Sequence, residues 1–333
     1  MGRRAPAAGP GGGIRARARR GPAGRARLTR AAAVKLAAAC LLAAWSALAS
    51  GVAFAQAEPP VELSGTLLKA RTSGAVTLAY RESSIPFSYL SARGEPIGYS
   101  IELCRRLVDA IGEAVGRELE IKWLPVTPES RIDAVVSGKA DLECGSTTNN
   151  LERQKRVGFS PTIFVSGTKL LVKRGSTIKS FRDLPGKSVV VTAGTTNEQT
   201  MRDLARKFKL DFGLLRSRDH AESFAQVLGG KADAFATDDV LLYGLIAQNK
   251  AKGKYLVVGE FLSYDPYGIM YRKGDAQLAD LINHAFHDLA EDGEVEREYR
   301  RWFLNRLPSG TSIDLPMSPQ LETLIRAMAA KPE

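Results

Sequence analysis

Residues 138–155 read GKADLECGSTTNNLERQK, and this stretch indicates the fold class most clearly. It follows a helical pattern at 131–136, which Gly138 ends, and it opens with a predicted strand at 140–143. A polar segment comes directly after that strand and precedes a helical turn that contains Arg153. A helix, a glycine stop, a strand and a polar strand end are typical of sheets whose strands alternate with helices.

The alternation continues on both sides of this stretch. We expect strands at 76–80, 119–124, 168–172, 188–192, 232–236, 255–258 and 267–271. We expect helices at 66–71, 99–115, 198–207, 221–228, 276–289, 294–303 and 319–328. Strand–helix–strand order implies parallel pairing, so the sequence predicts an α/β fold built from two units of similar type.

The charge of the chain is concentrated at its beginning. The 333 residues carry a formal net charge of +11, yet residues 1–55 hold ten basic residues and no acidic one. An apolar run at 36–49 follows the basic region and leads to Ala53-Phe54-Ala55, which is typical of a cleavable signal peptide. Cleavage after Ala55 leaves 37 basic and 36 acidic residues, and this near balance argues against nucleic acid as a partner.

Two other interpretations of the leader stay open. Residues 36–55 are just long enough for an uncleaved membrane anchor, although Ser46, Ser50 and Gly51 weaken that interpretation. Cys40 could carry a lipid, but only four residues separate it from Lys35.

The cysteines of the exported part allow two interpretations. Cys104 and Cys144 could form a disulfide in an oxidising compartment, or each could be a small buried apolar residue. Cysteine and histidine residues do not cluster with zinc-binding spacing, so we expect no metal and no cofactor.

Polar clusters follow several predicted strands or begin helices. They are 81–84, 145–150, 193–197 and 238–239, with Arg131 and His220 near two further helix starts. Each cluster alone could simply cap a helix. Together, two sets of helix-start N–H groups with arginines beside them suit a ligand with more than one carboxylate, and a strand-end aspartate suits an ammonium group. These groups describe an acidic amino acid.

Three segments carry a resemblance to a known family. They are 81–88 (RESSIPFS), 143–155 (ECGSTTNNLERQK) and 194–197 (GTTN). The chain resembles the periplasmic glutamate/aspartate-binding proteins of ABC uptake systems, which are solute-binding proteins of family 3. The resemblance implies a monomer with the two-lobed type II periplasmic binding protein fold, in which each lobe is a mainly parallel sheet and two crossover strands form the hinge. It also implies delivery of L-glutamate or L-aspartate to an inner-membrane permease of a Gram-negative cell.

The resemblance also suggests boundaries for the parts of the chain. Its predicted parts are a signal peptide (1–55), a lead-in (56–75), a first lobe (76–167 plus 269–333) and a second lobe (168–268).

The resemblance assigns five ligand contacts to the first lobe. Arg81 and Arg131 would contact the ligand carboxylates, and Arg153 would hold the α-carboxylate. Ser146 and Thr148 would bind through their hydroxyls or backbone N–H groups.

It assigns four contacts to the second lobe. Thr195 and Thr196 would supply backbone N–H groups, His220 would approach the side-chain carboxylate, and Asp238 would accept the ammonium group. Pro128 stands where relatives often have serine, so the preference between glutamate and aspartate stays open.

Other functions remain as alternatives. An enzyme on the same scaffold, similar to cyclohexadienyl dehydratase, would need a proton donor, for which Glu82, Glu143 and His220 are candidates. A protein that binds amide amino acids, or the sensor domain of a receptor, would use the same fold. We expect a binding protein and not an enzyme.

Overall fold

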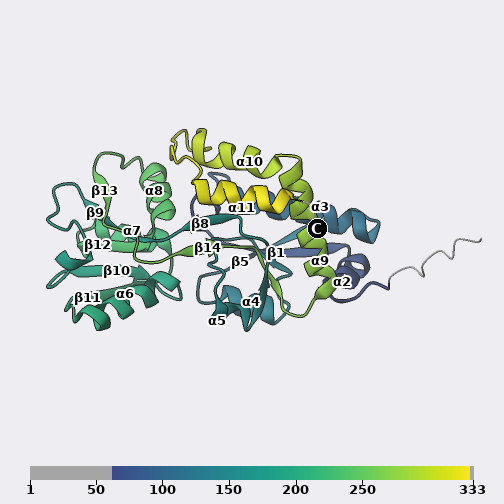
Figure 1. Cartoon of the computed structure of the whole chain (residues 1–333), viewed down its shortest axis with the longest axis horizontal. Helices are drawn as coiled ribbons and strands as arrows, with labels where there is room; N and C mark the ends of the chain where they lie inside the picture. The colour runs from purple at the N-terminus through teal and green to yellow at the C-terminus, as the bar shows by residue number, and fades with distance from the viewer. Residues whose placement is uncertain (1–61, 331–333) are drawn as a thin grey trace, which may run out of the picture. The chain divides into compact units, whose positions relative to one another are not determined.

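The structure is a computed structural model that describes residues 62–330. The predicted signal peptide and the first part of the lead-in lie outside the described residues. Two five-stranded sheets dominate the described part, and the chain passes between them through a pair of short strands (Figure 1).

The first sheet carries helices on both of its faces. Its strands, in order across the sheet, are β5 (Glu120–Pro125), β1 (Ala75–Tyr80), β6 (Leu142–Glu143), β15 (Met270–Arg272) and β7 (Val157–Phe159). Leu78 packs into the core that contains α3 (Tyr99–Val115), while its neighbour Ala79 packs with α4 (Arg131–Val136) on the other face. Neighbouring residues of a strand point to opposite faces, so both faces of β1 are covered, and Thr77 is the one residue of this strand that is not hydrophobic.

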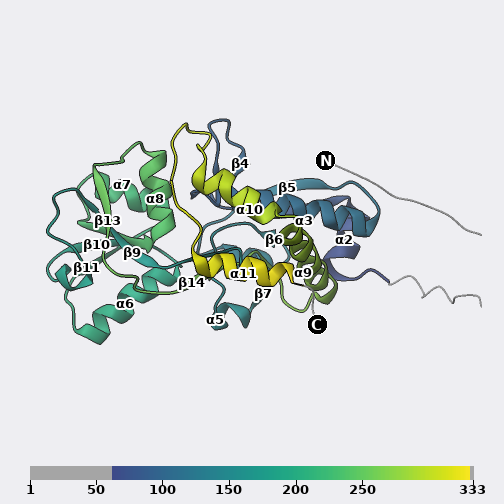
Figure 2. The same ribbon diagram turned by 45° about the horizontal axis from the view of Figure 1, so that its top comes forward.

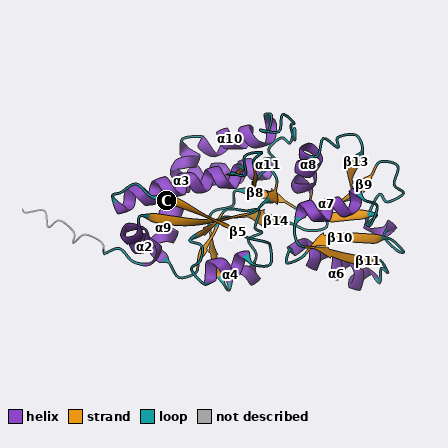
Figure 3. Cartoon of the chain, turned by 180° about the vertical axis from the view of Figure 1, so that it is seen from behind, coloured by secondary structure: helices purple, strands orange, loops and turns teal. Residues whose placement is uncertain are grey.

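The second sheet is built in the same way. Its strands, in order, are β11 (Gly213–Ser217), β10 (Ser188–Thr192), β12 (Ala234–Asp238), β9 (Thr168–Lys173) and β13 (Tyr255–Val258). Val189 and Val191 pack in the core that contains Met201 of α6 (Thr196–Phe208). Val190 points the other way, toward Phe224 of α7 (His220–Leu228). Figure 3 shows the strands between α6 on one side and α7 with α8 (Asp239–Gln248) on the other.

In both sheets four of the five strands run in one direction, as expected for mainly parallel sheets, and one strand runs against them. β1 runs parallel to β5 and β6, and β10 runs parallel to β11 and β12. β15 and β9 run antiparallel to their neighbours because each of them follows a crossing between the two sheets. The crossing strands, β8 (Phe164–Ser166) and β14 (Asp265–Tyr267), pair with each other in antiparallel fashion.

Aromatic side chains fill the core around the crossing strands. Phe87, Phe164 and Tyr267 pack at ring-centroid distances between 5.0 and 5.9 Å, and Tyr299 and Phe303 extend the cluster. The last two come from α10 (Glu294–Tyr299) and the π-helical turn Arg300–Leu304. The chain then reaches α11 (Pro319–Ala329), which packs on α9 (Ala276–Glu291), as Figure 2 shows.

Four sequence-based expectations about elements need correction. The strand expected at 140–143 is only Leu142–Glu143, because Asp141 turns to accept a hydrogen bond from the Thr77 backbone N–H (2.8 Å). The strand expected at 232–236 is Ala234–Asp238. The strand expected at 267–271 is interrupted and gives β14 and β15, and the helix expected at 294–303 changes to a π-helical turn at Arg300. A small sheet of β2 (Ser83–Ser84), β3 (Ser88–Leu90) and β4 (Pro96–Ile97) was not predicted.

The structure answers the question left open about the cysteines. Cys104 and Cys144 form a disulfide, with their Cα atoms 6.2 Å apart. The bridge ties α3 to the residue that follows β6, so it anchors the start of the polar segment 145–150. Within residues 62–330, no helix combines the length and the apolar character needed to cross a membrane.

Candidate functional site

Three buried arginines lie where the strands of the first sheet end. Arg81 follows β1, Arg131 is the first residue of α4, and Arg153 lies in α5 (Leu151–Gln154). Their exposed fractions are only 1%, 2% and 8%. Parallel strands place their carboxyl ends at one edge of a sheet, and β1 and β6 run parallel here, so residues distant in sequence meet at this edge.

The arginines leave donors unused. Both Nη atoms of Arg81 and the Nε atom of Arg131 are buried without a hydrogen-bond partner, and so is the Ser146 hydroxyl. Burial, followed by the charge of Arg131, lowers the pKa of Arg81 and of Arg153 to about 9. Buried charges without partners are costly, and unpartnered donors that gather in one place are the mark of an anion site.

The remaining donors hold the polar loop in place. Arg153 donates from Nη1 to the Thr148 carbonyl (2.9 Å), and Arg131 donates from Nη1 to the Ser146 carbonyl (3.4 Å). On the other side of the loop, Ser100 donates to the Gly145 carbonyl (2.8 Å). The disulfide adds a covalent tie at the neighbouring residue. The loop 145–148 is therefore fixed from several directions before any ligand arrives.

The second sheet contributes a helix start. Thr195 caps α6, because its hydroxyl accepts from the Glu198 N–H (3.2 Å) and donates to the Thr192 carbonyl (2.7 Å). Its hydroxyl is thus used in the cap. The Thr196 hydroxyl lies 3.2 Å from the Thr148 hydroxyl, which joins the helix start to the loop of the first sheet.

His220 faces the arginines as a neutral imidazole. Its ring is buried, and its Nδ1 lies 2.8 Å from the Thr192 hydroxyl. Burial and the charges of Arg81 and Arg131 lower the pKa of His220 well below its usual value. The imidazole can therefore hydrogen-bond an anion without adding a charge of its own.

Asp238 forms an acidic corner with Asp265. Its carboxylate accepts from Asn197 Nδ2 (2.8 Å) and from the Tyr267 hydroxyl, and only 3% of the residue is exposed. Burial, and then the charge of Asp265, raise the pKa of Asp238 to about 8. Asp265 is also buried and accepts from the Thr148 hydroxyl (3.1 Å). A cation would relieve the repulsion between these two carboxylates.

Asp265, Asn197 and Tyr267 were missed by the sequence analysis. Asp265 begins β14 and does not follow a strand that ends at the site, so the strand-end argument did not reach it. Asn197 belongs to the predicted cluster 193–197, but nothing in the sequence connects its amide to Asp238. Tyr267 was expected only as part of a strand.

The two sheet units are closed on each other around these residues. Arg216 of β11 donates to Glu129 (3.0 Å), which lies just before α4. Gly194 has φ +75°, and a Cβ there would lie 2.9 Å from the Glu129 backbone nitrogen. A Cβ added to Gly244 of α8 would lie 2.2 Å from the Ile85 carbonyl oxygen. The arginines and the acidic corner are therefore enclosed.

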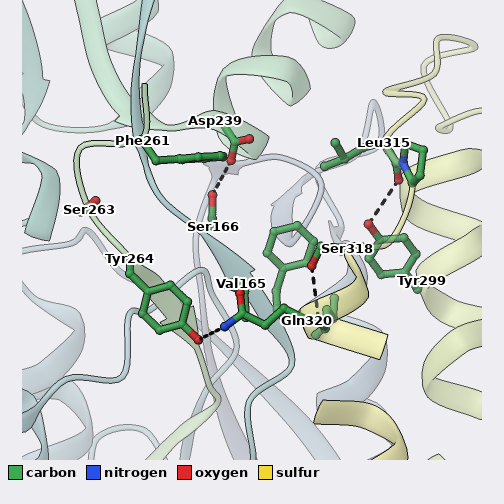
Figure 4. A pocket seen from close by; sticks show the side chains of 13 residues that line it. Val165, Ser166, Asp239, Phe261, Ser263, Tyr264, Tyr299, Leu315, Ser318 and Gln320 are labelled. Atoms are coloured by element: carbon green, nitrogen blue, oxygen red, sulfur yellow. Dashed lines mark hydrogen bonds between the residues drawn. The ribbon is translucent and has the colours of Figure 1, made fainter. Parts of the chain in front are cut away.

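A hollow of about 460 Å³ lies beside the crossing strands, and no arginine lines it (Figure 4). Aromatic and apolar side chains form most of its wall, including Phe164, Phe261, Tyr264 and Tyr299. Among the described residues that line it, Asp239 is the only charged one. This hollow does not suit an anion, so the candidate site is the arginine cluster.

All nine residues proposed from the sequence lie at the two facing edges. Those at the edge of the first sheet are Arg81, Arg131, Ser146, Thr148 and Arg153; those from the second are Thr195, Thr196, His220 and Asp238. Several contacts and charge effects link the two groups, among them Thr148 with Thr196 and Arg81 with His220.

Fold and site together define a protein that encloses a small charged solute. Residues 76–305 match the bacterial extracellular solute-binding proteins, family 3, and the chain belongs to this family. It is 42% identical to the L-glutamate/L-aspartate-binding protein of Pseudomonas aeruginosa, over 86% of this chain and 97% of that protein. It is 38% identical to the glutamate/aspartate import solute-binding protein of Escherichia coli, over 84% of this chain and 94% of that protein.

Solved structures agree with the fold. One of them is an ancestral amino acid-binding protein, a precursor of cyclohexadienyl dehydratase. It superposes with a TM-score of 0.63 at 30% identity, and the match covers 72% of this chain and 99% of that protein. The curated relatives are solute-binding proteins and not enzymes, and the chain is a binding protein.

Proposed function

We propose that this protein captures L-glutamate or L-aspartate in the periplasm and delivers it to an ABC permease of the inner membrane. The names of the two relatives support the ligand class and the import role. The observation that carries the proposal is the set of unused, buried donors on Arg81 and Arg131, next to the charge of Arg153. Two carboxylates of one ligand would neutralise this cluster.

In this proposal, the residues of the first lobe would bind the two carboxylates of the ligand. The two carboxylates would each accept one or two hydrogen bonds from the guanidinium groups of Arg81, Arg131 and Arg153. Guanidinium groups match carboxylates in shape and stay charged when desolvated. Ser146 and Thr148 would add hydroxyl or backbone donors from the fixed loop.

The second unit would complete the site. The start of α6 at Thr195 and Thr196 would direct backbone N–H groups at a carboxylate. His220 would hydrogen-bond the side-chain carboxylate. Asp238, with Asp265 beside it, would accept the ammonium group.

Capture would proceed by closure of two lobes. We assign residues 76–167 and 269–333 to the first lobe and 168–268 to the second, with β8 and β14 as the hinge, and residues 1–55 to a cleaved signal peptide. Ligand would bind first to the arginines and then recruit the second lobe, because those contacts exist only in the closed state. The permease would recognise the closed form of the monomer.

A calorimetric titration panel tests the ligand class. Glutamate, aspartate, glutamine and asparagine are titrated into protein that has been unfolded and refolded to remove carried ligand. We expect the two acids to bind at least about a hundredfold more tightly than their amides, because an amide leaves a buried arginine unpaired. Equal or tighter binding of the amides would overturn the assignment of two carboxylates.

A further inference from the structure

Glu143 is a buried carboxylate that no contact fully explains. It ends β6 in the middle of the first sheet, and its exposed fraction is 0%. Oε2 accepts a hydrogen bond from the Thr147 hydroxyl (2.6 Å), but Oε1 is buried without a hydrogen-bond partner. Because an unsatisfied buried polar atom is costly, we expect another interaction of this carboxyl oxygen.

The arginines supply that interaction. A Cβ added to Gly145 would lie 2.2 Å from Glu143 Oε1 and 3.1 Å from Arg81 Cγ, so the carboxylate and the arginine stem meet at this glycine. The charge of Glu143 also acts on Arg131 and on Arg153. Among the described residues, it is the one carboxylate that raises the pKa of all three guanidinium groups.

We propose that Glu143 is a specificity-determining residue, the fixed internal counter-charge that sets how much negative charge the arginine cluster accepts from a ligand. Other carboxylates, among them Asp238 and Asp265, act on one or two of the guanidinium groups, but Glu143 acts on all three and so offsets part of the charge that a ligand would otherwise neutralise. This inference rests on the proposed function. It assigns Glu143 no contact with the ligand, since its role is to limit the charge that the site selects.

The inference predicts what happens when that charge is removed. Glu143→Gln keeps the shape of the side chain and can keep the hydrogen bond to Thr147, but it removes the one negative charge that acts on all three guanidinium groups. The altered site should then favour a ligand with one more negative charge than glutamate carries. A residue that served only to support the loop would weaken all ligands alike.

Two ligands of the same shape isolate the charge. L-homocysteate carries a singly charged sulfonate, and L-2-amino-4-phosphonobutyrate carries a phosphonate that is close to doubly charged at about pH 8. Dissociation constants of both are measured by calorimetry for the wild-type protein and for Glu143→Gln. We expect the substitution to change the ratio of the two dissociation constants by about tenfold or more, so that the phosphonate gains affinity relative to the sulfonate. The reason is that a unit charge acts strongly over a few ångströms in a buried site.

Asp141→Asn is the matched control. Asp141 is also buried, two residues earlier in the chain, but it pairs with Lys69 (2.7 Å) and not with the arginines. Its substitution should leave the ratio unchanged, and so should Glu143→Asp, which keeps the charge. If Glu143→Gln keeps the wild-type ratio of the sulfonate and phosphonate dissociation constants, the inference is wrong. If the wild-type protein fails to bind glutamate at all, the proposed function fails instead.

A second variant covers the case in which Glu143→Gln does not fold. Glu143→Gln combined with Arg81→Gln removes one charge of each sign and restores the balance. Recovery of a cooperative thermal transition in the double variant would support the counter-charge role. Continued failure to fold would contradict it, because the loss would then stem from the shape of the site and not from its charge.

Discussion

At the scale of single residues, the closed site brings charged groups together without enough partners. Arg81, Arg131 and Arg153 are buried with too few partners, and Asp238 is held next to Asp265. Such groups are costly in the closed form unless a complementary ligand pairs with them. Affinity and stability should therefore respond in opposite directions to changes at these positions.

Arg131→Met tests this opposition. Removing the guanidinium group should weaken glutamate binding by about 2–5 kcal/mol, because a desolvated ligand carboxylate loses its charged partner. The melting temperature of the empty protein should stay the same or rise, since methionine keeps the bulk of the side chain without the buried charge. Calorimetry and thermal melts measure both quantities, and Arg93→Met, at an exposed position, is the control. Unchanged glutamate affinity in Arg131→Met would remove Arg131 from the site.

Asp238 should make binding depend on pH. Its pKa of about 8 in the empty site means that its carboxyl is protonated at neutral pH, while a bound ammonium group favours the ionised form. Glutamate binding should therefore release a proton near pH 7, and affinity should rise by up to tenfold per unit between about pH 6 and 8. His220 does not oppose this in the empty protein, because its lowered pKa keeps it neutral.

The proton count is measured by calorimetry at one pH in two buffers that differ in ionisation enthalpy. Asp238→Asn should abolish the release. The same raised pKa also predicts that the empty protein loses stability as pH rises from about 4 toward 8, since the folded state holds a proton that the unfolded chain gives up. Identical binding heats in the two buffers would contradict the assignment.

At the scale of elements, the start of α6 has to approach the turn before α4. Gly194 permits this, because it has a positive φ and its Cα lies against the Glu129 backbone. The Arg216–Glu129 ion pair lies at the same contact. Closure is therefore possible only if this position carries no side chain.

Gly194→Ala should block the last step of closure. The added Cβ would lie 2.7–3.0 Å from atoms of Glu129, including backbone atoms that cannot turn aside. We expect glutamate affinity to fall by about tenfold or more, while the variant remains folded, since one alanine at positive φ costs only about 1 kcal/mol. Gly186→Ala is the matched control, with φ +71° and nothing within 4 Å of the added Cβ. If both variants bind glutamate equally well, Gly194 has no role in closure.

Periodicity predicted most of the elements because buried strands and amphipathic helices repeat at fixed spacings. Strand limits near the site were less predictable. Asp141 and Asp238 are polar residues whose hydrogen bonds depend on partners far away in the chain, Thr77 and Asn197. A local pattern contains no information about such partners.

At the scale of the whole molecule, the sequence suggested the three arginines and Asp238 as site residues, but not Asp265, the second residue of the acidic corner. Arg81, Arg131 and Arg153 each stand at a strand end or a helix start, where the topology of parallel strands brings side chains together. Asp265 reaches the site only because the chain returns through β14. It accepts a hydrogen bond there from the hydroxyl of Thr148, which lies 117 residues earlier in the sequence. Contacts of that kind follow from tertiary structure alone.

The two parts of the chain differ in their net charge. The excess positive charge belongs to residues 1–55, and residues 56–333 are close to neutral. The proposed function depends instead on a few arginines buried at one edge of the first sheet, with donors that have no hydrogen-bond partner. The central claim is that a ligand with two carboxylates completes them.

A crystal structure of the protein with L-glutamate tests this claim most directly. The account predicts both ligand carboxylates within hydrogen-bond distance of the three guanidinium groups, the ammonium group at Asp238, and the lobes closed as described here. Glutamate bound elsewhere, or bound with Arg81 and Arg131 still unpaired, would contradict it.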